Sequence, residues 1–439
     1  MAQTKWSSTT KAAGSIFNRT PKCLEDKTMS QLSMQIQRRE FLGSACALAG
    51  LAGLAPAAPV PANGPGSPTK GATTGDLFAT DRLHEIQLEI DPADWALLRE
   101  RYLENDWYWC RVQWNGINVK AAVRSRGNGS RNPVKPSLRL SFKSSADSGP
   151  FLDQETLVLG NMVQDSSLLK NPLAYSLFAK MGIPAPRLSY ARVSVNGIYW
   201  GLYQVCEDLD TPYVLNRLGE KDGYLYEYKW VDEYQFEQRG QGRDNDYIPE
   251  PFELKNNSKN PNPAPLMGLI ETINTPGGEG FWQALAAYGD PNQWLTFLAV
   301  ETLVDDRDGL LGNWGLNGFF LYNYARSTRF ALLPWDKDWS FFRWDRPMLE
   351  KADGNVLFRR LLETNAGRDF FRAELARAAA IAGGPGGWLE SEARRRQTLT
   401  WKSALDDQRR VEGTGPIGAA QGQLIEFTQR RVDFLRRQL

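Results

Sequence analysis

Hydrophobic and polar residues alternate in several short stretches of the first half of the chain, a pattern that predicts half-buried β-strands. The clearest stretch runs from Leu83 to Ile90, where the apolar residues largely fall on every second position. The dipeptide Asn196-Gly197 separates two such stretches and is a strong signal for a hairpin turn. Four further strands are predicted over 119–126, 137–142, 189–195 and 201–206.

Helical patterns are sparse before residue 210 and dominate after it. A short helix is predicted over 91–102, because Asp91 is a good N-cap and Pro92 suits a first turn. A second helix is predicted over 166–181. Beyond Thr211, helices are predicted over 281–288 and 291–305 and again after a hairpin of strands 318–324 and 329–334.

This order of elements predicts an α+β fold in two parts. Residues 79–209 form a small lobe around a mostly antiparallel sheet, and residues 210–439 form a mainly helical lobe that carries the β-hairpin. The segment 229–265 is rich in Asn, Asp, Gln and Pro, and we expect it to be a polar surface loop. A length of 439 residues fits two domains or one two-lobed unit.

The first 62 residues have the pattern of an export signal. Arg38 and Arg39 precede an uncharged stretch, 41–62, which ends in small-residue cleavage patterns and is similar to a twin-arginine signal. A start at Met29 or Met34 would give a signal of normal length, so we expect residues 1–28 not to be translated. Residues 63–78 are predicted to be a disordered linker. The mature chain, with no later run long enough for a membrane span, is expected in the periplasm, at the cell surface or outside the cell.

Composition excludes several kinds of chemistry. Lys and Arg total 52 against 51 Asp and Glu, so the composition does not require a strongly basic surface. Nucleic acid is therefore not an expected partner. The chain has one histidine, His84, which cannot build a multi-histidine zinc site and disfavours catalysis by a Ser–His–Asp or Cys–His set. We interpret His84 as a packed strand residue. Cys110 and Cys206 remain after the signal, either bridged or as two buried thiols.

Acidic and amide side chains are predicted to converge at the hairpin in the second half of the chain. Pairing about a turn near residue 326 would place Asn317 opposite Trp335, one residue before Asp336. Hard oxygen ligands gathered at a loop edge suit Mg²⁺ or Mn²⁺, with phosphate and water completing the shell. A structural Ca²⁺ site or a solvated turn would use the same residues. The gathered residues are Asp305, Asp306, Asp308, Asn317, Asp336 and Asp338.

Five blocks between about residues 80 and 375 carry a family resemblance. The most specific are 195–207, VNGIYWGLYQVCE, and 334–341, PWDKDWSF. The others are 124–130, RSRGNGS, then 135–143, KPSLRLSFK, and 165–171, DSSLLKN. In this order they resemble the spore coat protein H (CotH) family of atypical protein kinases. The resemblance implies a two-lobed kinase-like fold that binds ATP and Mg²⁺ or Mn²⁺ between its lobes.

The resemblance also implies roles for acidic residues. Asp336 corresponds to the metal-binding aspartate, and Asp338 follows it in the same block. Asp308 resembles the catalytic-loop aspartate that orients the attacking hydroxyl or accepts its proton. Asn317 is the candidate ligand of a second metal ion, with an alignment that is ambiguous by one residue.

Basic residues of the small lobe are the candidates for binding the nucleotide. Lys135, or else Lys143, would neutralise the phosphates, and Arg126 would add donors, while Glu207 would lie near the adenine. Each has a plainer interpretation: the lysines as strand-edge residues, and Glu207 as a hydrogen-bonded structural carboxylate. Two departures from the family stand out: the Asp305-Asp306-Arg307 sequence, and a predicted helix 166–181 without a glutamate to pair with a lysine.

Three functions are consistent with these patterns. The first is an exported kinase that transfers the γ-phosphate of ATP to Ser or Thr of a surface or secreted protein. The second is a non-catalytic adhesion or structural module on the same fold. The third is a glycoside hydrolase with paired carboxylates, which would need two facing carboxyl groups in an open groove. The oligomeric state is left open.

Overall fold

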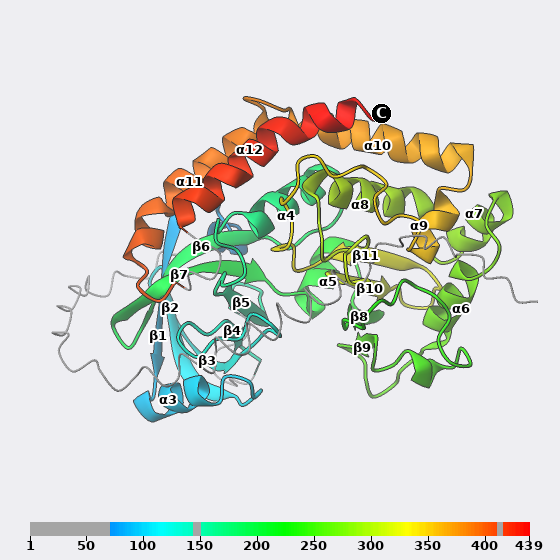
Figure 1. The fold of residues 1–439 in the computed structure, drawn as a ribbon. Helices are drawn as coiled ribbons and strands as arrows, with labels where there is room; N and C mark the ends of the chain where they lie inside the picture. Colours follow the sequence, from blue (N-terminus) through cyan, green and yellow to red (C-terminus); the bar gives the residue numbers. More distant parts are fainter. Residues whose placement is uncertain (1–70, 144–150, 411–415) are drawn as a thin grey trace, which may run out of the picture. The chain divides into compact units, whose positions relative to one another are not determined.

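The computed structural model describes residues 71–143, 151–410 and 416–439. These residues form two β-sheets and a set of helices (Figure 1), which confirms the α+β class. The predicted signal, residues 1–62, lies outside the described residues. Half of the predicted linker, residues 63–70, also lies outside them, and its described half contains the short helix α2 (Thr74–Leu77) with Leu77 buried. Across the described ranges, no helix combines the length and apolar character that a membrane crossing requires.

The first sheet is a closed barrel whose strand order is β1-β2-β3-β4-β5-β7-β6. Strands β1 and β6 pair in parallel and close the barrel, and every other pair is antiparallel. One continuous cluster of buried apolar side chains fills its interior. The strands are β1 (Leu83–Ile90), β2 (Tyr108–Trp114), β3 (Ile117–Ser125), β4 (Leu138–Ser141), β5 (Thr156–Gly160), β6 (Leu188–Val195) and β7 (Ile198–Glu207).

Strands β2 and β5 do not appear in the sequence-based prediction. In β2 the exposed side of the strand carries Trp109, so the polar–apolar alternation is hidden. In β5 four successive residues are buried, so no alternation exists. The hairpin predicted at Asn196-Gly197 does join β6 to β7, with φ angles of 51° and 78°. The helix predicted over 91–102 is α3 (Pro92–Glu100), which begins after Asp91 as expected.

The second sheet has four antiparallel strands in the order β11-β10-β8-β9. It consists of β8 (Tyr224–Tyr228), β9 (Phe252–Leu254), β10 (Phe319–Asn323) and β11 (Phe330–Pro334). The prediction of an isolated hairpin is therefore too simple. The pairing of β10 with β11 is also shifted by one residue, because Phe319 lies opposite Pro334.

The segment 229–265 is not a simple surface loop. It contributes β9 and the 3₁₀ turn Asp244–Asp246, and it buries Tyr234, Phe236 and Tyr247 in the main core. These aromatic side chains are spaced singly among polar residues. Single anchors of this kind produce no periodic pattern, so the sequence did not reveal the packing.

Helices surround this second sheet. They are α4 (Lys170–Lys180), α5 (Thr211–Leu218), α6 (Ala264–Ile273), α7 (Glu279–Ala286), α8 (Pro291–Val304), α9 (Val356–Leu361), α10 (Asn365–Ala382), α11 (Trp388–Asp406) and α12 (Ile417–Arg436). Helix α8 is buried along almost its whole length and packs against α10, α4 and α12. A helix buried on every side is expected at the centre of a core. Figure 1 shows α11 and α12 side by side.

Two local features depart from the sequence-based expectation. Helix α4 begins at Lys170 rather than 166, because the Asp165 carboxylate accepts hydrogen bonds from the Ser167 and Lys170 amides and holds the preceding turn outside the helix. Cys110 and Cys206 are free, buried thiols. The structure therefore shows the second of the two alternatives left open for the cysteines.

Arg431 of α12 holds the end of α8. Its guanidinium donates hydrogen bonds to the carbonyl oxygens of Thr302 at 2.6 Å and Leu303 at 3.2 Å, in the last turn of α8. It also donates to the carbonyls of Trp344 at 3.0 Å and Arg346 at 2.5 Å. Carbonyls in the last turn of a helix lack regular intrahelical donors. Arg431 supplies a donor to Leu303 and a second donor to Thr302, which also accepts from the Asp305 amide, and its positive charge suits the helix C-terminus.

We expect Arg431→Met to lower the free energy of unfolding by about 3–5 kcal/mol, since it leaves buried carbonyls without a donor. Denaturant unfolding followed by circular dichroism measures this loss. Arg436→Met, also on α12, is the matched control, because the Arg436 side chain is 53% exposed and pairs at the surface with Asp433. Equal losses in the two variants would contradict the assignment.

Candidate functional site

The C-terminus of α8 and the two ends of the β10–β11 hairpin bring acidic side chains together. Helix α8 ends at Val304, and Asp305 follows as its C-cap with a left-handed φ of 49°. The chain then returns to the hairpin, where the Asn317 amide donates a hydrogen bond of 2.9 Å to Asp308 Oδ2. The structure thus places Asp308 and Asn317 in direct contact.

The Asp336-Lys337-Asp338 turn follows β11 and is attached to helix α4. The Asp336 amide donates to the Tyr175 hydroxyl at 3.1 Å, and the Lys337 amide donates to Asn171 Oδ1 at 2.6 Å. Asp336 has a left-handed φ of 50°. Its side chain is accessible to solvent, whereas Asp338 is 9% exposed.

The carboxylates of Asp308, Asp336 and Asp338 influence one another. Burial raises the pKa of Asp308 to about 7, and the charges of Asp306 and Asp336 raise it further. Desolvation also raises the pKa of Asp336. The pKa of Asp338 is raised by burial and, as the next largest cause, by the charge of Asp336. Within the described residues none of these three carboxylates forms an ion pair with Lys or Arg. The raised pKa values follow from burial and from the proximity of the carboxylates to one another and to Asp306.

Lys337 turns in the opposite direction and is buried in an ionic triad. Its Nζ lies 2.7 Å from Glu301 Oε1 and 2.8 Å from Asp306 Oδ2, and the side chains are 0% to 2% exposed. Space for the triad comes from two glycines: a Cβ on Gly318 would lie 2.9 Å from Lys337 Nζ, and one on Gly309 would lie 2.5 Å from Glu301 Oε1. The triad fixes the turn between Asp336 and Asp338.

Sequence reasoning did not single out Glu301 or Lys337. The available signal was Glu301 itself, a charged residue within an otherwise apolar helix, since buried charges are paired. Asp306 also has a structural position. Besides the lysine, it accepts a hydrogen bond of 3.1 Å from the Asp308 amide, so it links the triad to the cluster.

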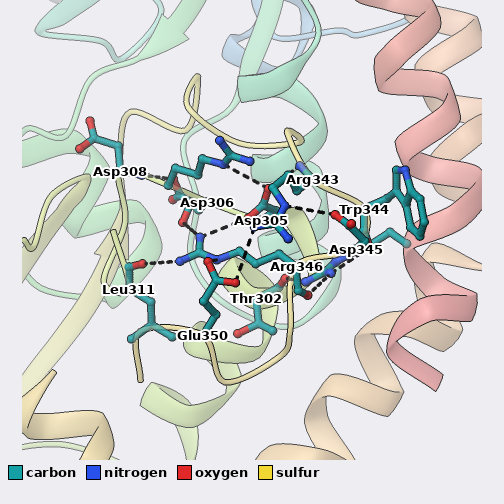
Figure 2. A network of polar contacts seen from close by, with 12 residues as sticks. Thr302, Asp305, Asp306, Asp308, Leu311, Arg343, Trp344, Asp345, Arg346 and Glu350 are labelled. Atoms are coloured by element: carbon teal, nitrogen blue, oxygen red, sulfur yellow. Dashed lines mark hydrogen bonds and ion pairs between the residues drawn. The ribbon is translucent and has the colours of Figure 1, made fainter. Parts of the chain in front are cut away.

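Asp305 belongs to a buried network that adjoins the cluster, because Arg346 donates to both the Asp305 carboxylate and the Asp306 carbonyl (Figure 2). Its carboxylate lies 3.2 Å from Arg346 Nη1 and 3.4 Å from Arg307 Nε, and it accepts a hydrogen bond from the Arg343 amide. Arg307 therefore pairs with Asp305, not with Asp308, Asp336 or Asp338. We interpret this network as a support for the loop after α8.

Two cations from other elements lie near the cluster. Arg126, after β3, places its guanidinium 5.5 Å from the centre of the Trp335 ring, and its charge acts on Asp336 more strongly than any other charge does. Lys170, the first residue of α4, lies 3.7 Å from the centre of the Phe342 ring, and its charge acts on Asp338. Neither forms an ion pair with a carboxylate among the described residues. Lys170 lies in the 165–171 block but was not singled out from the sequence.

Lys135 lies in a different environment. Its Nζ is buried and bound to Asp407 Oδ2 at 2.6 Å and to the Leu202 carbonyl at 2.7 Å. The same carboxylate lies 2.6 Å from the position of a Cβ on Gly201, where only glycine leaves room. The structure therefore engages Lys135 in an ion pair with the end of α11 and does not join it to the carboxylate cluster.

Lys143 and Glu207 also have other partners. Lys143 has a 53% exposed side chain that pairs with Glu155 at 2.5 Å. The buried Glu207 carboxylate binds Arg187 at 2.5 Å and Arg217 at 3.1 Å. The position of Glu207 matches its plainer interpretation as a structural carboxylate. The interpretation of the lysines as strand-edge residues does not hold, because β4 is paired on both sides in the closed barrel and Lys135 is buried in an ion pair.

A divalent cation fits the donors of the cluster. Across the described residues there is no group of three or more His, Cys, Asp or Glu side chains placed to hold a metal ion by themselves. Mg²⁺ in phosphoryl-transfer sites is usually bound by only one or two carboxylates together with substrate phosphates. Asp336, Asp338 and Asn317 are hard oxygen donors, and this is the chemistry that Mg²⁺ or Mn²⁺ requires.

Comparison with known proteins identifies the family. The model of the family described as CotH kinase protein matches residues 123–381, so the chain belongs to the CotH family and the resemblance seen in the sequence is confirmed. The inner spore coat protein H of Bacillus subtilis (strain 168) is 24% identical over 253 residues, 57% of this chain and 67% of the relative. An inner spore coat protein H-like protein of the same organism is 36% identical over 69 residues, 16% of this chain and 21% of that protein.

Among solved structures, the chain is similar to a Helicobacter pylori proinflammatory kinase, CtkA. The match has 10% sequence identity and a TM-score of 0.29, and it covers 69% of this chain and 93% of that chain.

We expect Lys337→Met to lower the free energy of unfolding by about 3–5 kcal/mol, because Glu301 and Asp306 would remain buried without a cation. Chemical denaturation measures the loss, and Glu301→Gln in the same chain should recover part of it. Lys402→Met is the control, since the Lys402 side chain is 88% exposed. A loss as small as that of the control would show that the triad does not stabilise the turn.

Proposed function

We propose that this chain is an ATP-dependent protein kinase that transfers the γ-phosphate to Ser or Thr of a surface or secreted protein, with Mg²⁺ or Mn²⁺. Membership of the CotH kinase family supports the proposal. The observation that carries it is the cluster of Asp308, Asp336 and Asp338, with the cations Arg126 and Lys170 beside it, none of which forms an ion pair in the part of the chain that the structure describes. In this proposal the nucleotide contacts Arg126, which follows a barrel strand, and the carboxylates that follow α8 and β11, as a two-lobed kinase-like site would require.

Each residue has a role in this proposal. Asp336 and Asp338, with Asn317, would hold the metal ion, which neutralises negative charge on the phosphates. Arg126 and Lys170 would donate to phosphate oxygens, the role that the sequence suggested for Lys135.

Asp308 would orient the acceptor hydroxyl or take its proton. A pKa raised to about 7 suits a base that works near neutral pH. The hydrogen bond from Asn317 fixes the direction of its carboxylate.

The charge requirements of phosphoryl transfer agree with this composition. Catalysis of this reaction depends mainly on positioning and on charge stabilisation, and needs no covalent intermediate on the protein. A chain with a single histidine, buried in the barrel, can therefore carry it out. Export also remains part of the proposal, on the basis of the twin-arginine pattern in residues 1–62.

We expect Asp336→Asn to reduce phosphate transfer by about 10²–10³-fold or more, since removing one charge-stabilising group has effects of this size. Labelled ATP, Mg²⁺ or Mn²⁺ and a casein-like acceptor measure transfer. The thermal midpoint should change little, because this side chain is accessible and forms no ion pair within the described chain.

Asp353→Asn, at an exposed loop position, is the matched control. If the wild-type chain neither binds nucleotide nor transfers label, the kinase proposal is wrong and a non-catalytic adhesion or structural module on the same fold replaces it. If Asp336→Asn unfolds the protein, the carboxylate is structural.

We expect Arg126→Gln to raise the KM for ATP by about tenfold or more, which corresponds to the loss of a hydrogen bond to a charged group. Steady-state kinetics with varied ATP measures the change. Lys143→Gln is the control and should leave this KM unchanged, because Lys143 is exposed and pairs with Glu155. A larger increase of this KM in Lys143→Gln than in Arg126→Gln would contradict the proposal and would show that Lys143 binds the phosphates.

A further inference from the structure

A line of aromatic rings extends from the candidate site over the neighbouring surface. It begins beside Asp308, since the amide of Arg307, the preceding residue, donates a hydrogen bond of 2.9 Å to the Trp339 carbonyl. We call this line the aromatic track and define it as Phe342, Trp339, Trp314 and Trp230.

Each member of the track contacts the next. The ring centres of Phe342 and Trp339 lie 5.6 Å apart, and those of Trp339 and Trp314 lie 5.4 Å apart. Trp230 continues the line, because its indole N–H donates a hydrogen bond of 3.2 Å to the Trp314 carbonyl. The track is therefore continuous from the carboxylate cluster to the segment after β8.

The two ends of the track are open to solvent. Phe342 is 43% exposed and Trp230 is 38% exposed, and the two rings between them are partly buried. A contiguous row of exposed aromatic rings is costly in water and is typical of a surface that a partner covers. The rings at such a surface supply much of the binding energy.

Positive charge lies at the end of the track nearest the site. Lys170 lies 3.7 Å and Arg307 lies 4.7 Å from the centre of the Phe342 ring. An acidic side chain next to the acceptor residue would meet this positive charge, which comes from Arg307, also paired with Asp305, and from Lys170, which the proposed function places at the phosphates. A basic side chain would be repelled at the same position.

The inclination of the rings selects the kind of partner. Trp314 and Trp339 stand at 85° to one another, and Trp339 and Phe342 at 33°. Sugar rings stack on flat platforms, which these inclined rings do not provide. They form instead a corrugated surface, into which the separate side chains of an extended peptide fit.

We propose that the aromatic track is the docking surface for the acceptor segment of the protein substrate. That segment is an extended peptide with apolar side chains on one side of its Ser or Thr and an acidic residue close to it. The inference rests on the proposed kinase function, because the track matters as an acceptor site only if phosphate is transferred at Asp308.

The test uses fluorescent peptides with one fixed Ser and measures binding by anisotropy in the absence of ATP. Four sets of peptides differ in the residues that flank the Ser. The first set has Glu together with Leu and Phe, the second has Glu without them, and the third has Leu and Phe without Glu. The fourth set has Lys in place of Glu, together with Leu and Phe. We expect the first set to bind best. Trp230→Ala and Phe342→Ala should each weaken its binding about tenfold or more, and Trp230→Ala should raise the KM for the peptide with little change in kcat.

Trp401→Ala is the matched control, since Trp401 is 37% exposed on α11, outside the track, and its replacement should leave peptide binding unchanged. Unchanged peptide binding in both track variants would overturn the inference even where phosphate transfer is intact. Tighter binding of the Lys set, or of a soluble glycan in place of peptides, would also overturn it. Peptide binding that depends on the track in a chain that transfers no phosphate would support the surface and reject the kinase proposal.

Discussion

The buried contact of Lys337 with Glu301 and Asp306 is the constraint on which the site depends. A lysine between two aspartates could have left all three side chains in water. Here the lysine turns inward and forms ion pairs with two buried carboxylates, Glu301 and Asp306. The neighbouring aspartates therefore remain on the other side of the turn, away from the triad. The glycines at 309 and 318 belong to the same constraint, because any larger residue there would collide with the triad.

The charges of this chain fall into two groups, and the division indicates where function lies. Asp305, Glu207 and Lys135 are buried with partners of opposite charge at hydrogen-bonding distance. Their charges are satisfied within the fold. Asp308, Asp336 and Asp338 have neighbours of the same charge and raised pKa values. A fold keeps such an unfavourable arrangement where a cationic ligand can relieve it.

The sequence could predict the acidic cluster, because hairpin geometry links residues that are close in the chain. Asn317 and Asp308 are in contact although the predicted strand register was one residue off.

Contacts between residues far apart in the sequence gave no such signal. The partner of Lys135 is Asp407, which is 272 residues later in the sequence, and no local pattern connects the two residues. The aromatic anchors of 229–265 were missed for a similar reason, since a single buried ring among polar residues has no period. The role of Lys170 could not be predicted either, because it depends on helix α4 beginning at Lys170, four residues later than the predicted helix.

The matched family region ends at residue 381, but the end of α8 depends on a residue beyond it. Arg431 of α12 donates to carbonyls in the last turn of α8 and to two carbonyls of the segment that follows the Asp336–Asp338 turn. One buried guanidinium thus joins both chain segments that carry the candidate site. Asp305, at the C-cap of α8, adds to this junction through Arg346. The site is therefore positioned by the C-terminal helix as well as by its own loop: the Asp305 and Asp306 amides donate to the Thr302 and Glu301 carbonyls, and Arg431 adds the donors for Leu303 and Thr302.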